Sequence, residues 1–532
     1  MASPHPNAPT HARRTRLVTL LFGLLCVLVA VYATQRLDIG LYDETAYLHR
    51  GAMIDTEGMP DADMAPLYSL WYRALQFVLA DPVDRYFLNL GFTIALLPFL
   101  FFLVLRALGT SISAAFLAGL FILLSTLNIL NWPRVSVFAL IILLLGLLFR
   151  SVSRSRDRGW AIVSCAAIVA TYIRPEFALS IFGLIGLWIH DAKRRVRGGD
   201  PPAKRWAWVP GLLALVLVLW LGSPFGHGRS TVAFGQHYAL NKVATGSGDM
   251  DPWTGWEAIA AADLGSSTSL TTALTTAPDR ILWHIGQNLR QLVPAIGRMM
   301  LPAGARMDRV ASVLLIALCL ALGWSLYTTR EPGAPHRGTY AMVLVLSLPA
   351  LIAAVIIHPR QHYLIFPIIL CMLPALARIF PVGTRGTDRA PWMLAASAAA
   401  ILVLYSGRPF GKPERPVLAT INALRRSELP GPLVILDPDG GYATYQRAGS
   451  IQVPTTEMRT GFNEFIAKHG INVIVSSPRS EADPRFAQDP AWLRFKADPR
   501  GAGARVEQVA GTAITIYTLE APVRLPHRPA QE

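Results

Sequence analysis

The sequence predicts a polytopic α-helical membrane protein with a small α/β domain at its C-terminal end. Of its 532 residues, 52% are hydrophobic and only 16% are charged, whereas soluble proteins carry about 25% charged residues. The apolar residues are gathered in long uncharged runs, which short clusters of arginine and lysine separate. This composition excludes an ordinary soluble enzyme and a disordered chain.

Eleven uncharged stretches are candidate membrane spans, since a helix needs about 20 apolar residues, and at least about 17, to cross a bilayer. These stretches are Leu17–Gln35, Tyr86–Leu105, Ala107–Pro133, Val135–Phe149, Gly159–Ile173, Phe177–His190, Trp206–Gly228, Val310–Thr329, Gly338–Pro359, Gln361–Ala377 and Ala390–Gly407. The three between Val135 and His190 are short, so they are either buried in the bundle or re-entrant. We expect about 11 transmembrane helices, with nine as the alternative.

The basic residues predict the orientation, because cytoplasmic loops are enriched in arginine and lysine. With the N-terminus in the cytoplasm, nearly all basic clusters, such as Arg150–Arg158, fall in inner loops. The short outer loops then hold only Arg134, Arg174 and Arg360. We therefore expect the N-terminus inside and the C-terminus outside. The net charge of +15 then indicates topology and contact with anionic lipid, not nucleic-acid binding.

Composition divides the chain into three parts. We expect a disordered cytoplasmic tip over residues 1–16, a membrane domain over 17–407 with outer loops at 36–85 and 229–308, and an extracytoplasmic domain over 408–532. The tail is richer in charge, proline and glycine. Its apolar runs predict strands and one segment predicts a helix: Leu433–Leu436, Ile471–Val475, Ala513–Leu519, and helical Gly461–His469.

The first outer loop places adjacent carboxylates close to the predicted membrane surface. Asp38 follows the first span, and Tyr42-Asp43-Glu44-Thr45-Ala46-Tyr47 comes soon after it. Carboxylates at this depth are costly unless they are solvated or have a function. Pro66-Leu67-Tyr68 and the amphipathic run Ser69–Leu79 indicate that the loop lies along the interface. A solvated loop end is the alternative interpretation of the carboxylates.

Two more motifs fall on the same expected side, namely Ile173-Arg174-Pro175-Glu176 and the stretch His358–Pro367. Together with Tyr42–Tyr47 and Pro66-Leu67-Tyr68, they resemble the C-type (GT-C) integral-membrane glycosyltransferases. That superfamily includes the protein O-mannosyltransferases and the aminoarabinose transferase that acts on lipid A. The layout of the chain also agrees with the family, although the resemblance in sequence covers only these short motifs.

The resemblance implies transfer of a sugar from a polyprenyl-phosphate donor to an acceptor hydroxyl, with inversion, on the outer face of the cytoplasmic (inner) membrane. Asp43 matches the family's first-loop aspartate, which is usually the general base. The chemistry agrees, because an attacking sugar hydroxyl needs a carboxylate to accept its proton. Glu44 is expected to assist Asp43 or to hold the acceptor, and Asp38 is a further acceptor contact.

The departing lipid phosphate needs positive charge, and Arg174 and Arg360 are the candidates. Both lie in short outer loops, against the positive-inside bias. His358, His362 and Tyr363 follow as further donors to the phosphate. For Arg174, the alternative is a residue that snorkels to the interface beside Glu176.

The outer loop at 229–308 is longer than a passive connection needs to be. His237 and Asp251 are candidate acceptor contacts in it, and Asp279–Leu292 predicts a helix. The alternative is that these residues cap and pack a surface subdomain.

The sequence contains no motif for other common kinds of enzyme site. The four cysteines lie in apolar runs, and there is no phosphate-binding glycine loop, zinc-protease motif or serine-nucleophile motif. We expect no cofactor, although a divalent ion on first-loop carboxylates stays open because some members of the superfamily hold one. The expected partners are a polyprenyl-phosphate-linked sugar, a glycan, lipid or protein acceptor, and membrane lipids. The alternatives are a transporter or lipid-linked glycan flippase, and a non-catalytic envelope-assembly protein.

Overall fold

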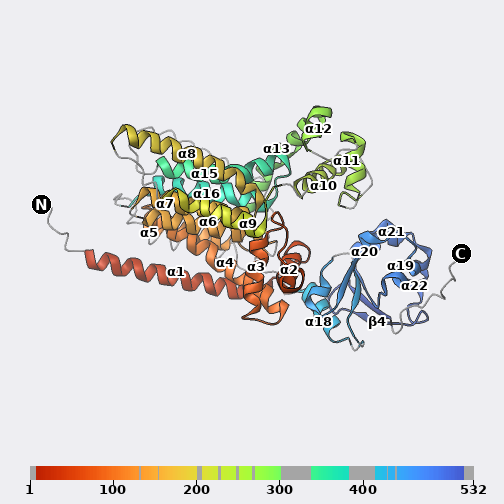
Figure 1. Ribbon diagram of the computed structural model, residues 1–532. Coiled ribbons are helices and arrows are strands. Elements are labelled where there is room, and N and C mark those ends of the chain that lie inside the picture. Colours follow the sequence, from red (N-terminus) through yellow and green to blue (C-terminus); the bar gives the residue numbers. More distant parts are fainter. Residues whose placement is uncertain are drawn as a thin grey trace.

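A computed structural model describes residues 8–130, 133–153, 155–199, 206–225, 229–246, 251–253, 255–265, 270–300, 337–382, 414–427, 429, 431–437 and 440–519. Within these ranges the chain is mostly helical and has a five-stranded sheet near its C-terminal end. Figure 1 shows a helical bundle with two smaller units at one of its ends, helices α10–α12 and the sheet domain. The predicted spans Val310–Thr329 and Ala390–Gly407 lie outside the described ranges.

Five of the described helices are long and apolar enough to cross a membrane. They are α1 (Ala8–Arg36), α4 (Pro82–Ala107), α6 (Val135–Val152), α15 (Arg337–Ile356) and α16 (Gln361–Ile379). The apolar composition of these helices indicates a membrane protein. Residues 8–16 belong to α1, so the predicted disordered tip is wrong for these residues, while residues 1–7 lie outside the described part.

Four other predicted spans form helices that do not meet the same length and hydropathy criteria. They are α5 (Ile112–Leu124), α7 (Arg156–Thr171), α8 (Ala178–Arg197) and α9 (Trp208–Leu221). α5, α7 and α9 have 13, 16 and 14 residues, and α8 ends in a basic turn. The described helices therefore include five candidate spans, where the sequence predicts about eleven across the whole chain.

Proline and small polar residues account for several helix starts. Asp81 accepts a hydrogen bond from the backbone of Val83 at the start of α4, and Ser155 accepts one from Arg158 in α7. Proline occupies the first position of α4, where its missing N–H costs no hydrogen bond. These residues set where each helix leaves the loop before it.

The predicted continuous span Ala107–Pro133 is broken in the structure. α5 ends at Leu124, and the following residues approach α6 without forming a helix. Asn128 donates to the carbonyl of Ile94 at 2.9 Å, and Arg134 Nη1 donates to the carbonyl of Asn128 at 2.9 Å. Non-helical backbone within a membrane protein needs such internal partners, because lipid provides none.

Successive helices run in opposite directions, so their basic ends meet at one end of the bundle (Figure 1). Arg150, in the last turn of α6, donates to Thr339 near the start of α15. The C-terminal ends of α4 and α16 also meet. There the backbone N–H of Ser111 donates to the carbonyl of Phe380. The opposite end of the bundle carries α2 (Asp43–Glu57) and α3 (Pro66–Gln76).

Helices α2 and α3 pack closely against each other. At Gly51 an added Cβ would lie 2.6 Å from the carbonyl oxygen of Ser69 and 2.7 Å from Cβ of Tyr72. Only glycine permits this approach without movement of the α3 backbone. The amphipathic run predicted at Ser69–Leu79 overlaps α3, which begins three residues earlier at Pro66 and ends at Gln76.

The predicted outer loop at 229–308 forms a separate helical unit in its described residues. It contains α10 (Arg229–Ala244), α11 (Trp256–Leu264), α12 (Leu270–Thr276) and α13 (Pro278–Met300). The buried side chains of Phe234, Tyr238, Leu264 and Ile281 form its small core. α13 contains the predicted helix Asp279–Leu292 and packs against α15 and α16, which ties this unit to the bundle.

The C-terminal domain is a mixed sheet in the order β2-β1-β3-β5-β4. β1 pairs in parallel with β2 and β3, whereas β5 pairs antiparallel with β3 and β4. The elements are α18 (Pro416–Arg425), β1 (Val434–Asp437), η4 (Tyr442–Tyr445), β2 (Ile451–Pro454), η5 (Thr455–Glu457), α19 (Phe462–His469), β3 (Val473–Ser476), α20 (Pro478–Ala482), α21 (Pro484–Ala487), α22 (Pro490–Ala497), β4 (Ala504–Gln508) and β5 (Thr515–Leu519).

The two faces of this sheet have different neighbours. Leu436, Ile474 and Tyr517 share a core with the aromatic residues of α19 and α22. The alternate residues Ile435 and Val473 belong to the large core that continues into the bundle. This period-two alternation places one face of the sheet on its own helices and the other on the membrane domain.

Candidate functional site

The candidate site lies at the end of the bundle opposite to the C-terminal ends of α4 and α6. It is bounded by the start of α2, the η1 turn (Pro175–Phe177), the α15–α16 junction and α10. Asp43 is the first residue of α2 and its side chain is exposed. Tyr42, just before it, has a φ of 69°, which is strained for a residue with a Cβ. The chain therefore bends sharply at the point where it presents Asp43.

Glu44 is only 1% exposed, unlike its neighbour Asp43. Its Oε1 accepts hydrogen bonds from the hydroxyls of Tyr68 and Tyr72 and from Asn89 Nδ2, the last at 3.0 Å. Its Oε2 accepts from the backbone N–H of Arg134 at 2.5 Å. Burial raises the pKa of Glu44, and the tyrosine hydroxyls and Arg134 oppose that rise. Protein groups thus occupy both of its oxygens.

Arg134 extends the same buried cluster on its other side. Its Nε donates to Thr93 Oγ1 at 2.9 Å, and the residue is 1% exposed. Burial lowers the pKa of Arg134 to about 10, so the guanidinium stays charged at neutral pH. The sequence identifies Arg134 only as an outer-loop arginine. Its position against the positive-inside bias, which it shares with Arg174 and Arg360, was the available signal.

Arg174 pairs with Glu176. The guanidinium Nε donates to Glu176 Oε1 at 2.8 Å, and Arg174 also lies 4.9 Å from the ring centre of Tyr363. Burial alone would lower the pKa of Arg174, but Glu176 and Tyr363 outweigh it and raise that pKa. Arg174 therefore links η1 to the first turn of α16.

Arg360 is the residue just before α16, and its guanidinium lies 4.8 Å from the ring centre of Trp253. Burial lowers the pKa of Arg360, while Tyr363 and Asp43 act in the opposite direction through their negative forms. The Asp43 carboxylate is therefore within electrostatic reach of this guanidinium. Arg360 makes no ion pair with a carboxylate among the described residues. His362 stacks obliquely on Tyr363, with ring centres 4.3 Å apart.

His237 of α10 contacts the residues around Arg360. Its ring stacks on His358 with centres 5.3 Å apart and meets the edge of Trp253 at 5.7 Å. Nδ1 donates to the carbonyl of Ala233 at 2.6 Å, which fixes the neutral tautomer with a lone pair on Nε2. This Nε2 is buried and has no partner within the described ranges.

Burial and the nearby guanidinium keep these histidines neutral. Desolvation first and Arg360 second lower the pKa of His237 to about 3 and that of His358 to about 4. His284 of α13 is also buried, and burial lowers its pKa to about 4. His358 Nδ1 and Asn288 Oδ1 are 3.3 Å apart, so α13 also supports the cluster.

Asp251 and Asp38 have local structural partners. Asp251 Oδ1 accepts from the backbone N–H of Trp253 at 2.8 Å and so holds the loop that carries this tryptophan. Asp38 accepts from the backbone N–H groups of Val417 and Leu418 at 2.8 and 3.1 Å, at the start of α18. Asp38, predicted as an acceptor contact, is therefore used to dock the C-terminal domain.

The structure brings most of the predicted residues together, and it adds Trp253, which the sequence did not single out. Asp43, Arg174, Arg360, His237, His358, His362 and Tyr363 are linked by contact or by electrostatic interaction. Across the described ranges, no three His, Cys, Asp or Glu side chains gather as they would around a metal ion. No family model matches the chain, and no curated protein is significantly similar to it.

Proposed function

We propose that this chain is a GT-C-like integral-membrane glycosyltransferase that uses a polyprenyl-phosphate sugar donor. The observations that carry the proposal are the exposed Asp43 side chain at the start of α2 and, within its electrostatic reach, an Arg360 guanidinium packed against Trp253 beside the stacked rings of His237 and His358. An exposed carboxylate and a guanidinium without an ion-pair partner in the described chain lie at the same end of a helical bundle. Together they provide the base and the cation that sugar transfer from a lipid phosphate requires.

The reaction follows from this pair of charges. Asp43 accepts the proton of the acceptor hydroxyl while the hydroxyl oxygen bonds to the anomeric carbon. The bond from that carbon to the phosphate oxygen breaks, and its electron pair leaves with the lipid phosphate. Arg360 stabilises the charge that develops on this phosphate. A single displacement of this kind inverts the anomeric carbon.

Glu44 supports this chemistry as a positioning residue. It holds the start of α2 through Tyr68, Tyr72 and Arg134 and has no exposed oxygen for a substrate. Arg174 has a comparable supporting role, because its pairing with Glu176 leaves it packed against Tyr363. The phosphate contact is therefore assigned first to Arg360 and next to its neighbours His358, His362 and Tyr363.

His237 and Trp253 are the best candidates for sugar recognition. The lone pair on His237 Nε2 is buried and unpartnered within the described chain, and it lies beside the tryptophan that packs against Arg360. A sugar hydroxyl can donate to this nitrogen, and aromatic rings offer apolar faces to sugars. We assign this pair to the sugar or acceptor next to the phosphate, and we assign Asp251 to holding Trp253.

The proposed topology places this end of the bundle outside the cytoplasmic membrane and the N-terminus inside. The bundle then has about eleven spans when the stretches outside the described ranges are included, and the C-terminal domain is extracytoplasmic. The acceptor class is a glycan, lipid or protein of the cell envelope. We expect no cofactor, and the sequence leaves a divalent ion open.

The test compares envelope glycans by mass spectrometry in a deletion strain carrying wild-type protein, Asp43→Asn or Asp279→Asn. Asp279 provides the matched control, since its side chain is 77% exposed and lies on α13 away from the cluster. We expect Asp43→Asn to lose the same sugar as the deletion and Asp279→Asn to keep it. Full transfer by Asp43→Asn would remove the assignment. Unchanged glycans in the deletion strain, with altered solute uptake, would favour a transporter.

A further inference from the structure

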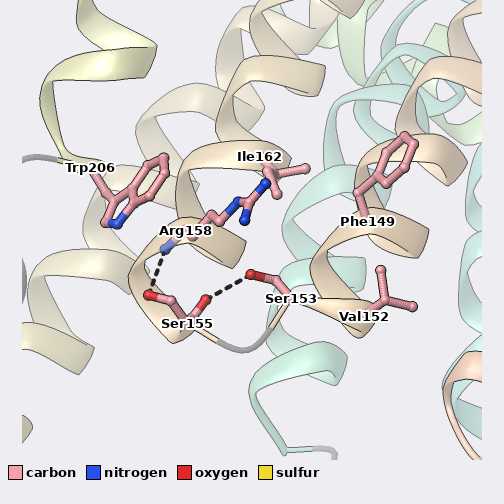
Figure 2. A pocket seen from close by; sticks show the side chains of 7 residues that line it. All are labelled: Phe149, Val152, Ser153, Ser155, Arg158, Ile162 and Trp206. Carbon is pink, nitrogen blue, oxygen red and sulfur yellow. Dashed lines mark hydrogen bonds between the residues drawn. The ribbon is translucent and has the colours of Figure 1, made fainter.

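A cavity of about 630 Å³ lies at the other end of the bundle from the candidate site (Figure 2). Phe149 and Val152 of α6, Arg158 and Ile162 of α7, and Trp206 before α9 contribute to its wall. The buried Arg134 precedes the first residue of α6, whereas Phe149 and Val152 lie near its last. The 18 residues of α6 separate the two regions by about 27 Å, at about 1.5 Å per residue. The cavity is thus a distinct feature.

One wall of the cavity is cationic. Figure 2 shows the Arg158 side chain extending between Trp206 and Phe149, and its guanidinium lies 5.7 Å from the ring centre of Trp206. Ser155 Oγ accepts from the backbone N–H of Arg158 at 3.4 Å, and Ser153 Oγ donates to the Ser155 carbonyl at 3.1 Å. These contacts use the backbone and leave the guanidinium itself to the cavity.

Neighbouring arginines differ from Arg158 in having protein partners. Arg156 pairs with Asp191 at 2.5 Å, and Arg195 pairs with Asp157 at 2.5 Å. Arg158 is exposed and, across the part of the chain that the structure describes, has no carboxylate partner. Since its neighbours neutralise the nearby carboxylates, the charge of Arg158 is available to an external anion.

The opposite wall is apolar and open. The side chains of Phe149 and Val152 are 54% and 64% exposed, and Ile162 is half-buried beside them. Such residues at the end of an apolar helix suit contact with acyl chains. Tryptophan and arginine side chains suit the level of the lipid headgroups. A free phosphate would satisfy Arg158 but would leave the apolar wall exposed to water.

We propose that this cavity binds an anionic phospholipid, with the headgroup phosphate on Arg158 and Trp206 and the acyl chains along Phe149, Val152 and Ile162. The charge of the phosphate complements a guanidinium that has no carboxylate partner in the described ranges, and the acyl chains complement the exposed apolar wall. The site does not depend on the proposed glycosyl transfer, because the cavity and the Asp43–Arg360 region lie at opposite ends of α6.

The test measures lipid retention by native mass spectrometry of the full-length protein in detergent. The protein is titrated with phosphatidylglycerol and, separately, with phosphatidylcholine. We expect the wild type to retain phosphatidylglycerol in preference, and Arg158→Ala to weaken that retention about fivefold. Arg194→Ala is the matched control, because Arg194 is exposed in the last turn of α8 at the same end and does not line the cavity.

A second variant distinguishes lipid binding in the cavity from lipid attraction by general surface charge. Ile162→Trp fills the cavity without changing any charge, and we expect it to weaken retention of phosphatidylglycerol as Arg158→Ala does. Unchanged thermal unfolding midpoints check that both variants are folded. Equal loss in Arg194→Ala, or full retention in Ile162→Trp, would overturn the proposal in favour of diffuse surface charge. Competition by millimolar inorganic phosphate would overturn it in favour of a simple anion site.

Discussion

Arg425 joins the C-terminal domain to the membrane domain by holding Asp81 with two hydrogen bonds of 2.8 and 3.0 Å. Asp81 also caps α4, and Arg425 Nε donates to the carbonyl of Tyr445 at 2.9 Å. One guanidinium thus connects the first turn of α4, α18 and η4. Tyr445 in turn lies 3.0 Å from Thr45 on α2, through their hydroxyl oxygens. The sheet domain therefore contacts the helix that begins at Asp43.

We expect the Asp81–Arg425 pair to stabilise the docked domain by about 1 kcal/mol, because the pair is bidentate but partly exposed. A double-mutant cycle with Asp81→Asn and Arg425→Gln, followed by thermal unfolding in detergent, measures this coupling. The same cycle on the pair Asp55–Arg73, whose carboxylate is 61% exposed, is the control and should give a smaller coupling. Strictly additive effects at Asp81 and Arg425 would contradict the expectation.

Removing the Glu44 side chain should destabilise the protein strongly. Glu44→Ala leaves the hydroxyls of Tyr68 and Tyr72 and the N–H of Arg134 without their acceptor, and each buried unsatisfied group costs about 1–3 kcal/mol. Glu44→Gln keeps one acceptor oxygen, so we expect a smaller loss. Thermal unfolding of the two variants measures the difference.

Tyr72→Phe is the matched control, since it removes a single donor from the same cluster. We expect its cost to be below that of Glu44→Ala. If Glu44→Gln were as stable as the wild type but lacked transfer activity, Glu44 would be a catalytic residue, as the sequence first indicated, and not a positioning residue.

Short apolar runs predicted part of the C-terminal domain correctly. The runs at Leu433–Leu436, Ile471–Val475 and Ala513–Leu519 correspond to β1, β3 and β5, and Gly461–His469 corresponds to α19. The strands β2 and β4 were not predicted. Their sequences, IQVP and ARVEQ, are short and partly polar, and only one residue of each strand is buried.

The distinction between Asp43 and Glu44 could not be predicted from the sequence. Successive residues of a helix point about 100° apart, so one carboxylate faces outwards and the other enters the bundle. The partners of Glu44 come from α3, α4 and the residue before α6. Local patterns do not reveal pairings across such separations. The break after α5 was missed for the same reason, because distant carbonyls such as that of Ile94 stabilise it.

Arg360 should control affinity for the lipid phosphate. We expect Arg360→Ala to weaken binding of undecaprenyl phosphate about tenfold or more, because a charge-assisted contact in a desolvated site is lost. Trp253→Leu should weaken it less, since the cation remains but its aromatic support is removed. Isothermal titration of the purified protein measures both affinities.

Arg280→Ala is the control for net charge, because the Arg280 side chain is 49% exposed on α13 and does not contact the cluster. It should bind undecaprenyl phosphate as the wild type does. Unchanged affinity of Arg360→Ala for undecaprenyl phosphate would show that Arg360 does not bind the phosphate. This result would not depend on whether Asp43 is the base.

The histidine cluster should make the protein sensitive to acid. The folded-state pKa values of His237 and His284 are about 3 and about 4, below the ordinary value of about 6.5 because burial disfavours the charged ring. Their contribution to stability is complete above about pH 6.5. It is lost as the pH falls towards the folded values, because the unfolded chain then binds protons that the folded chain excludes. At pH 5 each ring should contribute a loss of about 2 kcal/mol.

Unfolding midpoints measured from pH 7.5 to pH 5 test this expectation. The wild type should become less stable throughout the acidic part of this range. His237→Phe should start from a lower midpoint at pH 7.5 but lose less on acidification, because one proton-binding group is gone from the unfolded chain. His49→Gln, at an exposed position of α2, should keep the wild-type slope. Equal slopes in His237→Phe and the wild type would mean that other groups govern the acid response, so that His237 does not need to be neutral for the fold to persist.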